Sequence, residues 1–225
     1  MATLTDNLSS VPLPSLVDEV DNYYCSRLVE HYFQDNSEIA TVFRPFFLTS
    51  NIISDADDKQ QMKEWLASAG KTKQPKLLYR ASRDGWAAAD FHRLCDGKGA
   101  TITVVKSSAG YIFGGYTDVA WGGDAGYKSS SVSYLYSLKD DAGIGPVKMS
   151  IMRDLTAYAV YHDETNGPMF GQGNDLHIAT NENKVFGSMS YIGGNTYELP
   201  ANCSDESFLT GAEDFTVKEY EVFLV

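Results

Sequence analysis

A cysteine and a histidine three residues apart are the side chains of this sequence best suited to chemistry. His92 precedes Cys95 by three positions. Residues at this spacing in a helix lie on one face, so the imidazole could act as a base toward a thiol nucleophile. However, Cys95 falls at the C-terminal end of the helix predicted there, where the helix dipole raises the pKa of a thiol. We therefore interpret Cys95 as a core cysteine, with redox reactivity as the alternative.

The other side chains that could complete an enzyme site lie further along the chain. They are the histidines His162 and His177 and the acids Asp175 and Glu198. The sequence has no H-E-x-x-H metal motif, no G-x-S-x-G nucleophile elbow and no G-x-x-x-x-G-K-[ST] phosphate loop. We expect isolated histidines with local hydrogen bonds. The alternative is an enzyme or small-molecule-binding protein whose site is formed by these four residues together with His92 and Cys95.

Two features are candidates for contact with a partner protein. Arg80, Arg83 and Asp84 form a charged corner between a predicted strand and a predicted helix. Such a corner is either a local ion pair that fixes the turn or a docking point for an acidic partner. Trp121, which is followed by two glycines, is either an exposed anchor or a side chain buried under the edge of the fold.

The elements that must position these residues are predicted by local patterns. An apolar run at 77–79 indicates a strand, and apolar residues at helical spacing predict a helix over 86–95 that ends before Gly97. Residues 101–105 and 111–113, separated by a turn sequence, predict a hairpin. Further strands are predicted at 132–138, 147–152, 157–161, 175–180, 185–191 and 217–225. This spacing is typical of an antiparallel two-sheet β-sandwich, so we expect a mainly β (α+β) fold flanked by short helices.

Two helices are predicted before the first strand. Apolar residues recur four apart after a capping box that begins at Ser15, which indicates an amphipathic helix to about Gln34. We expect the apolar face of this helix to pack on its own domain. The alternative is that this face mediates self-association or binds a partner. A second capping box, Ser54 to Asp57, opens a helix that runs to about Ala69.

Composition and charge argue against several classes of protein. The 225 residues carry a net charge of −12, which disfavours binding to the phosphates of nucleic acids. The cysteines Cys25, Cys95 and Cys203 have no C-x-x-C spacing, so we expect reduced thiols and neither a disulfide framework nor a zinc site. No apolar run approaches the roughly 18 residues that span a bilayer, and no secretory leader is recognised. We expect a soluble, cytoplasmic protein without metal or cofactor.

Several stretches in consistent order resemble the TLDc domain family. They are RASRDGW, FHRLCDGKG, TITVVK and FGGYTDVAW between residues 80 and 121, then GNDLHI, YELP and the closing strand. The resemblance covers residues 48–225 and implies a β-sandwich flanked by helices. It leaves residues 1–47 as an N-terminal helical extension. Gly114, Gly115, Gly173 and Asp175 are the structural motif residues that it carries over.

The resemblance also implies a function. TLDc proteins are linked to protection against oxidative damage, and some bind the vacuolar proton-pumping ATPase and modulate its assembly or activity. The resemblance therefore implies a non-enzymatic protein-interaction domain, with vacuolar ATPase subunits as candidate partners. It differs from the ATPase-binding branch at residues 130–137, where the aromatic alternation is kept but the glutamate of that branch is missing.

Overall fold

The computed structural model describes residues 46–172, 174–179, 187–193, 196–201, 203 and 207–225. The chain divides into two compact units, Met1–Thr49 and Ser50–Val225. In the first unit, the described residues 46–49 form a turn. The amphipathic helix predicted over residues 15–34 lies outside the described residues, and so does Gly173.

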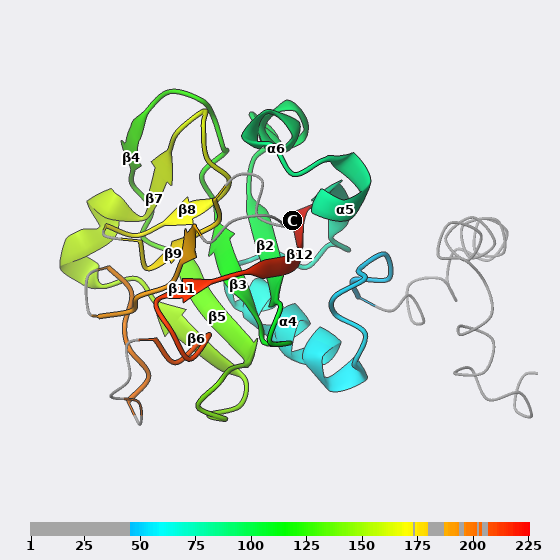
Figure 1. Cartoon of the computed structure of the whole chain (residues 1–225), viewed down its shortest axis with the longest axis vertical. Helices are drawn as coiled ribbons and strands as arrows, with labels where there is room; N and C mark the ends of the chain where they lie inside the picture. The colour runs from blue at the N-terminus through cyan, green and yellow to red at the C-terminus, as the bar shows by residue number, and fades with distance from the viewer. Residues whose placement is uncertain (1–45, 173, 180–186, 194–195, 202, 204–206) are drawn as a thin grey trace, which may run out of the picture. The chain divides into compact units, whose positions relative to one another are not determined.

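The second unit contains two antiparallel β-sheets, each with six strands in the described part of the chain (Figure 1). The first sheet has the order β1-β12-β2-β3-β5-β6, and its strands are Lys76–Arg80, Val217–Leu224, Thr101–Ser107, Ile112–Thr117, Tyr134–Lys139 and Val147–Ser150. The second has the order β11-β10-β9-β8-β7-β4, with strands Asp214–Phe215, Ser188–Met189, Leu176–His177, Met169–Phe170, Val160–His162 and Gly126–Lys128. The prediction of a mainly β, two-sheet antiparallel fold is confirmed.

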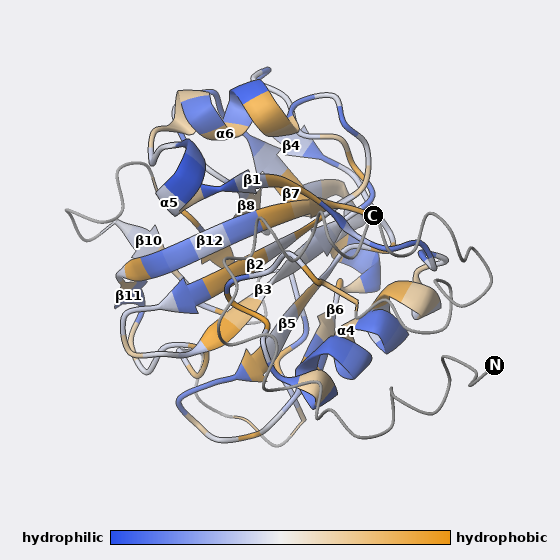
Figure 2. Ribbon diagram, turned by 90° about the vertical axis from the view of Figure 1, so that its right-hand side faces the viewer, coloured by the Kyte–Doolittle hydropathy of each residue, from blue (hydrophilic) through white to orange (hydrophobic). Residues whose placement is uncertain are grey.

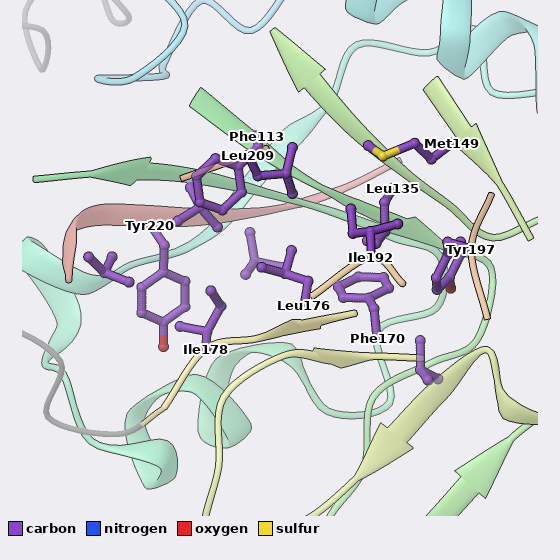
Figure 3. Close-up of a cluster of buried hydrophobic side chains, with 14 of the residues drawn as sticks. Phe113, Leu135, Met149, Phe170, Leu176, Ile178, Ile192, Tyr197, Leu209 and Tyr220 are labelled. Atoms are coloured by element: carbon purple, nitrogen blue, oxygen red, sulfur yellow. The ribbon is translucent and has the colours of Figure 1, made fainter. Parts of the chain in front are cut away.

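A hydrophobic core lies between the two sheets (Figure 3). Because side chains alternate along a strand, each long strand of the first sheet sends every second residue into this core. The sheets approach closely at Gly115 of β3, where a Cβ atom would lie 2.7 Å from the ring of Phe170 in β8. The labelled core residues are Phe113, Leu135, Met149, Phe170, Leu176, Ile178, Ile192, Tyr197, Leu209 and Tyr220.

The opposite face of the first sheet is covered by helix α4, Ala56–Ser68, which lies along β5 and β6 (Figure 2). Trp65 of α4 packs against Tyr136 of β5, with 5.8 Å between the ring centroids. The Tyr136 hydroxyl donates to the backbone oxygen of Thr103 at 2.8 Å, across Gly114. A Cβ on Gly114 would lie 2.0 Å from that oxygen, so this position requires glycine. The backbone or side chains of neighbouring elements therefore approach closely at both glycines of this pair.

Two helix predictions are corrected by the structure. The side chain that caps α4 belongs to Asp55 and not to Ser54: its carboxylate accepts from the backbone N–H groups of Asp57 and Asp58 at 2.8 and 3.3 Å. A carboxylate there also faces the positive end of the helix dipole, which favours it over a hydroxyl.

The helix predicted over 86–95 starts later than expected. Helix α6 spans Ala88–Cys95, and a separate helical turn, α5, occupies Ala81–Asp84. Gly85 ends α5 with a φ of 111°, a conformation that favours glycine, and so divides the two. Gly97, with a φ of 66°, follows α6 as the sequence predicted.

The C-terminal strand is an interior strand of the first sheet. Strand β12 has eight residues; it pairs with β2 from Val217 to Leu224 and with β1 from Glu221 to Leu224. A six-residue 3-10 helix, η1 (Arg153–Tyr158), connects β6 to β7. Within the described residues, no helix has both the length and the apolar character needed to cross a membrane.

Candidate functional site

His92 supports a loop and is held by three acceptors. Its Nδ1 atom lies 2.8 Å from Asp96 Oδ1, one turn further along, and its Nε2 atom lies 2.9 and 3.1 Å from the backbone oxygens of Asp163 and Asn166. Because carbonyl oxygens only accept, Nε2 is the donor to both of them. The ring therefore fastens α6 to the loop that follows β7.

His177 reaches the same loop from β9. Its Nε2 atom lies 3.0 Å from the side-chain oxygen of Asn166, so His92 and His177 both contact this one asparagine. Burial lowers the pKa of His177. The carboxylate of Asp163 accepts from the backbone N–H and the hydroxyl of Thr165, and these bonds lower the pKa of Asp163. The fold thus brings His92 and His177 to the same loop, where both stabilise it through hydrogen bonds.

His162 lies at the end of β7, beside Trp121. It is 4% exposed, its ring centroid is 5.8 Å from that of Trp121, and its Nδ1 atom is 3.5 Å from Asp124 Oδ1. Neither ring nitrogen has a hydrogen-bond partner among the described residues. Burial lowers its pKa, which favours the neutral ring at physiological pH.

Cys95 is a core residue, as the sequence predicted. It is fully buried on α6 within the cluster that contains Phe91 and Trp121. Burial raises the pKa of its thiol, and the nearby carboxylate of Asp96 raises it further. A thiol that stays protonated is neither a nucleophile nor a metal ligand. Although His92 is three residues away, its two ring nitrogens are occupied by the carboxylate of Asp96 and the loop carbonyls.

Of the two acids of the enzymatic alternative, Asp175 is buried and Glu198 is exposed. Asp175, at the turn before β9, is fully buried; its Oδ1 atom accepts from the Tyr197 backbone N–H at 3.3 Å, and Oδ2 has no partner among the described residues. Burial raises its pKa to about 6. Its carboxyl group fills the space above Gly171, where a Cβ would lie 1.9 Å from Oδ2. Glu198 instead lines an open groove of about 540 Å³ beside β6.

The charged corner divides into a buried and an exposed part. The Nε atom of Arg80 donates to the buried carboxylate of Glu221 in β12 at 2.7 Å. Arg83 is 47% exposed and makes a bidentate contact with Asp84, with donor–acceptor distances of 2.8 and 2.7 Å. The Arg83 guanidinium also donates to the Leu78 backbone oxygen at 3.2 Å. Asp84 is 15% exposed, so Arg83 is the part of this corner that a partner can reach.

Trp121 is not an exposed anchor. It is 3% exposed, and its indole N–H donates to the Thr101 hydroxyl at 2.8 Å. Its ring packs between Phe91 of α6 and Phe170 of β8, at 5.7 and 5.6 Å between centroids. The glycines that follow Trp121 do not expose it, because α6 covers the ring. The candidate role of Trp121 in partner binding is therefore wrong, and burial, the other reading of this residue, holds.

One polar residue that matters to this region was missed by sequence reasoning. Glu221 is fully buried and binds Arg80, the Ser50 hydroxyl at 2.6 Å and the Asn51 backbone N–H at 2.9 Å. The alternation of side chains along β12 places Glu221 on the face of the strand opposite Tyr220 and Val222. Nothing in the sequence indicated that residues 50–51 would cover this outer face.

Comparison with protein families matches residues 47–225 to the TLDc domain. The match covers more than half of the chain and includes both sheets and all of the charged corner. The chain belongs to the TLDc domain family. A search of curated proteins found no match to it. In this TLDc domain, the described residues contain no group of three or more histidine, cysteine, aspartate or glutamate side chains placed to hold a metal ion.

Proposed function

We propose that this TLDc domain is a non-enzymatic protein-interaction domain that contributes to protection against oxidative damage in the cytoplasm through a subunit of the vacuolar proton-pumping ATPase. Under this proposal, residues 48–225 form the binding domain and residues 1–47 an extension. The observation that carries it is the Arg83–Asp84 pair, which is held rigidly at the surface by its own bidentate contact and by Leu78.

A preorganised guanidinium is suited to recognition because little side-chain freedom is lost on binding. The Arg83 side chain keeps 47% of its surface exposed although its nitrogens already contact Asp84. A carboxylate from a partner can approach the remaining N–H groups, and a charge-assisted bond of this kind is geometrically specific. An acidic segment of the partner is the expected contact.

The enzymatic alternative draws little support from the same side chains. Cys95 is buried, which raises the pKa of its thiol, His92 is occupied by backbone oxygens, and Glu198 lies beside β6. A catalytic group has to contact the substrate, and the burial of Cys95 and the hydrogen bonds of His92 prevent this. Native mass spectrometry of the purified chain tests the alternative, because a retained small molecule or metal would favour it over the binding role.

The proposal is tested by affinity capture from the native cell extract, with proton-pump subunits quantified by mass spectrometry. We expect the wild-type chain to enrich these subunits, Arg83→Ala to lose most of them, and Arg153→Ala to retain them. Arg153 is a matched control because it is an exposed arginine on η1, on the other side of the molecule from α5 (Figure 1).

Two results would count against the proposal. Absence of pump subunits from the wild-type capture contradicts the ATPase partner. Equal retention by Arg83→Ala and wild type contradicts the assignment of the contact to the charged corner. Circular dichroism of both variants confirms that each is folded.

A further inference from the structure

Strand β6, the last strand of the first sheet, is only partly covered on its free side. Residues 196–198 run antiparallel to it there, on the side opposite β5. The Glu198 N–H donates to the Ser150 backbone oxygen at 2.9 Å, and the Met152 N–H donates to the Thr196 oxygen at 2.9 Å. These two bonds flank the bridge between Ile151 and Tyr197. The segment 196–198 therefore pairs with the end of β6 and leaves its beginning uncovered.

The pairing stops at a proline. Continued in the same register, it would bring Lys148 opposite Pro200. Proline has no N–H and cannot donate to the Lys148 carbonyl, and the Pro200 carbonyl accepts from the Cys203 N–H at 2.8 Å. Because the backbone groups of successive residues point to opposite sides of a strand, Lys148 directs its N–H and C=O away from β5, as Ser150 does. One donor and one acceptor of β6 are therefore left unused by residues 199–201.

These two backbone groups border the open groove of about 540 Å³ that Glu198 lines. The floor of the groove is apolar: Ile144, Val147 and Leu199 line it and also pack against the core between the sheets. The wall opposite β6 is fixed by Tyr197, which is fully buried and whose hydroxyl donates to the Ala159 backbone oxygen at 2.7 Å. The groove is therefore formed before any ligand binds, which lowers the entropic cost of binding.

The side chains of β6 show how an added strand would lie. The Nζ atom of Lys148 donates to the Ser68 hydroxyl of α4 at 3.1 Å and lies 5.2 Å from the centroid of the Tyr134 ring. The Lys148 side chain is thus on the α4 face of the sheet, and Val147 is on the core face. In a strand added beside β6, the residue opposite Lys148 would face α4, and the residues before and after it would face the apolar floor.

We propose that this groove binds an extended segment of a partner protein as a strand antiparallel to β6, with two apolar side chains, one residue apart, on its floor. An N–H and a C=O directed outward from one residue are matched by the C=O and N–H of one residue of an extended chain. A second copy of this chain is disfavoured, because two-fold pairing centred on Lys148 would place two lysine side chains directly opposite each other. The groove is independent of the Arg83 corner and of the ATPase proposal.

The test titrates the full, ¹⁵N-labelled chain with the capped peptide Ser-Val-Thr-Val-Ser and follows the backbone amide resonances by NMR. We expect the amides of Val147, Lys148 and Leu199 to shift. Methylation of the threonine nitrogen removes the donor to the Lys148 carbonyl and should weaken binding about tenfold. Methylation of the nitrogen of the second valine is the matched control, since that N–H points away from β6, and should have little effect. A peptide with serine in place of both valines should not bind.

Variants of the chain test the same contact from the other side. Lys148→Pro removes the N–H on the free edge and leaves the pairing with β5 intact, because that N–H points away from β5; it should weaken the peptide about tenfold. Lys148→Ala keeps the N–H and should bind like wild type. Leu199→Ser makes the floor more polar and should also weaken binding, whereas Arg83→Ala should leave it unchanged. Urea denaturation establishes that each variant is folded.

The proposal is overturned if the two N-methylated peptides bind equally, because the backbone of Lys148 would then not be read. It is also overturned if the unmodified peptide leaves the three amides unshifted. Light scattering is expected to give a monomer; a dimer whose dilution shifts these amides would make a second copy the occupant. Since none of these results involves proton-pump subunits, failure here leaves the proposed function standing, and the reverse also holds.

Discussion

Glu221 is a fully buried carboxylate on which three donors from two places in the sequence converge. Arg80 lies 141 residues away and the Ser50 hydroxyl 171 residues away, and both are within 2.7 Å of the carboxylate oxygens. An isolated charge at such a site would be costly, so these partners are what make the residue tolerable there. They also fasten residues 50–51 to the interior strand β12.

Replacing Arg80 tests this arrangement. Arg80→Ala leaves the Glu221 charge buried without its cation and is expected to lower the free energy of unfolding by about 3–5 kcal/mol. Urea denaturation followed by tryptophan fluorescence measures it. Arg83→Ala is the control: it removes an arginine from a half-exposed pair three residues away, and should cost at most about 1 kcal/mol. Equal small losses in the two variants would refute the assigned role of Arg80.

Asp175 gives the stability a pH dependence of opposite sign to that of a salt-bridged acid. Burial raises its pKa in the folded state to about 6, from 3.8. The native state therefore holds a proton that the unfolded chain releases between pH 3.8 and 6, and stability contributed by this group falls as pH rises through that window.

The neutral variant Asp175→Asn isolates this effect. The free energy of unfolding of wild type minus that of Asp175→Asn is expected to fall by on the order of 2 kcal/mol between pH 4 and pH 7. Urea titrations of both proteins at a series of pH values measure this difference. A difference that is flat or that rises with pH would show that Asp175 is charged in the folded state.

At the scale of elements, helix α4 depends on a single capping side chain. The Asp55 carboxylate accepts from two backbone N–H groups that otherwise have no partner inside the helix. Asp55→Ala should destabilise the domain by about 1 kcal/mol, measured by chemical denaturation. Ser54→Ala is the neighbouring control and should have an effect within about 0.5 kcal/mol. A larger loss of stability in Ser54→Ala than in Asp55→Ala would show that Ser54 is the capping residue.

At the scale of the whole molecule, the last strand of the chain holds the first sheet together. Strand β12 separates β1 from β2, and Val217, Tyr220, Val222 and Phe223 on it are buried. A chain ending at residue 216 loses the partner of both neighbours and is expected to show no cooperative unfolding transition in calorimetry. A chain comprising residues 46–225, which keeps β12, should unfold cooperatively; a cooperative transition in the chain ending at 216 would contradict this role.

The sequence alone determined the class of fold, most of the strands and the family. These are local properties: alternation along a strand, glycine where the backbone needs a positive φ, and short motifs in a fixed order. Gly97 was predicted correctly because the constraint on it, the end of its own helix, is local. The cap of α4 was misplaced by one residue because Ser54 and Asp55 both have the right chemistry.

Only the tertiary structure decided which polar residues meet. His92 contacts Asn166 across 74 residues, Arg80 contacts Glu221 across 141, and Tyr127 pairs with Tyr161 through the ladder of β4 and β7. Burial was decided in the same way: Trp121 is covered because α6 folds over it, whereas Tyr127 is exposed because β4 is the last strand of its sheet. Such contacts depend on the order of strands in the sheets, which no local pattern in the sequence specifies.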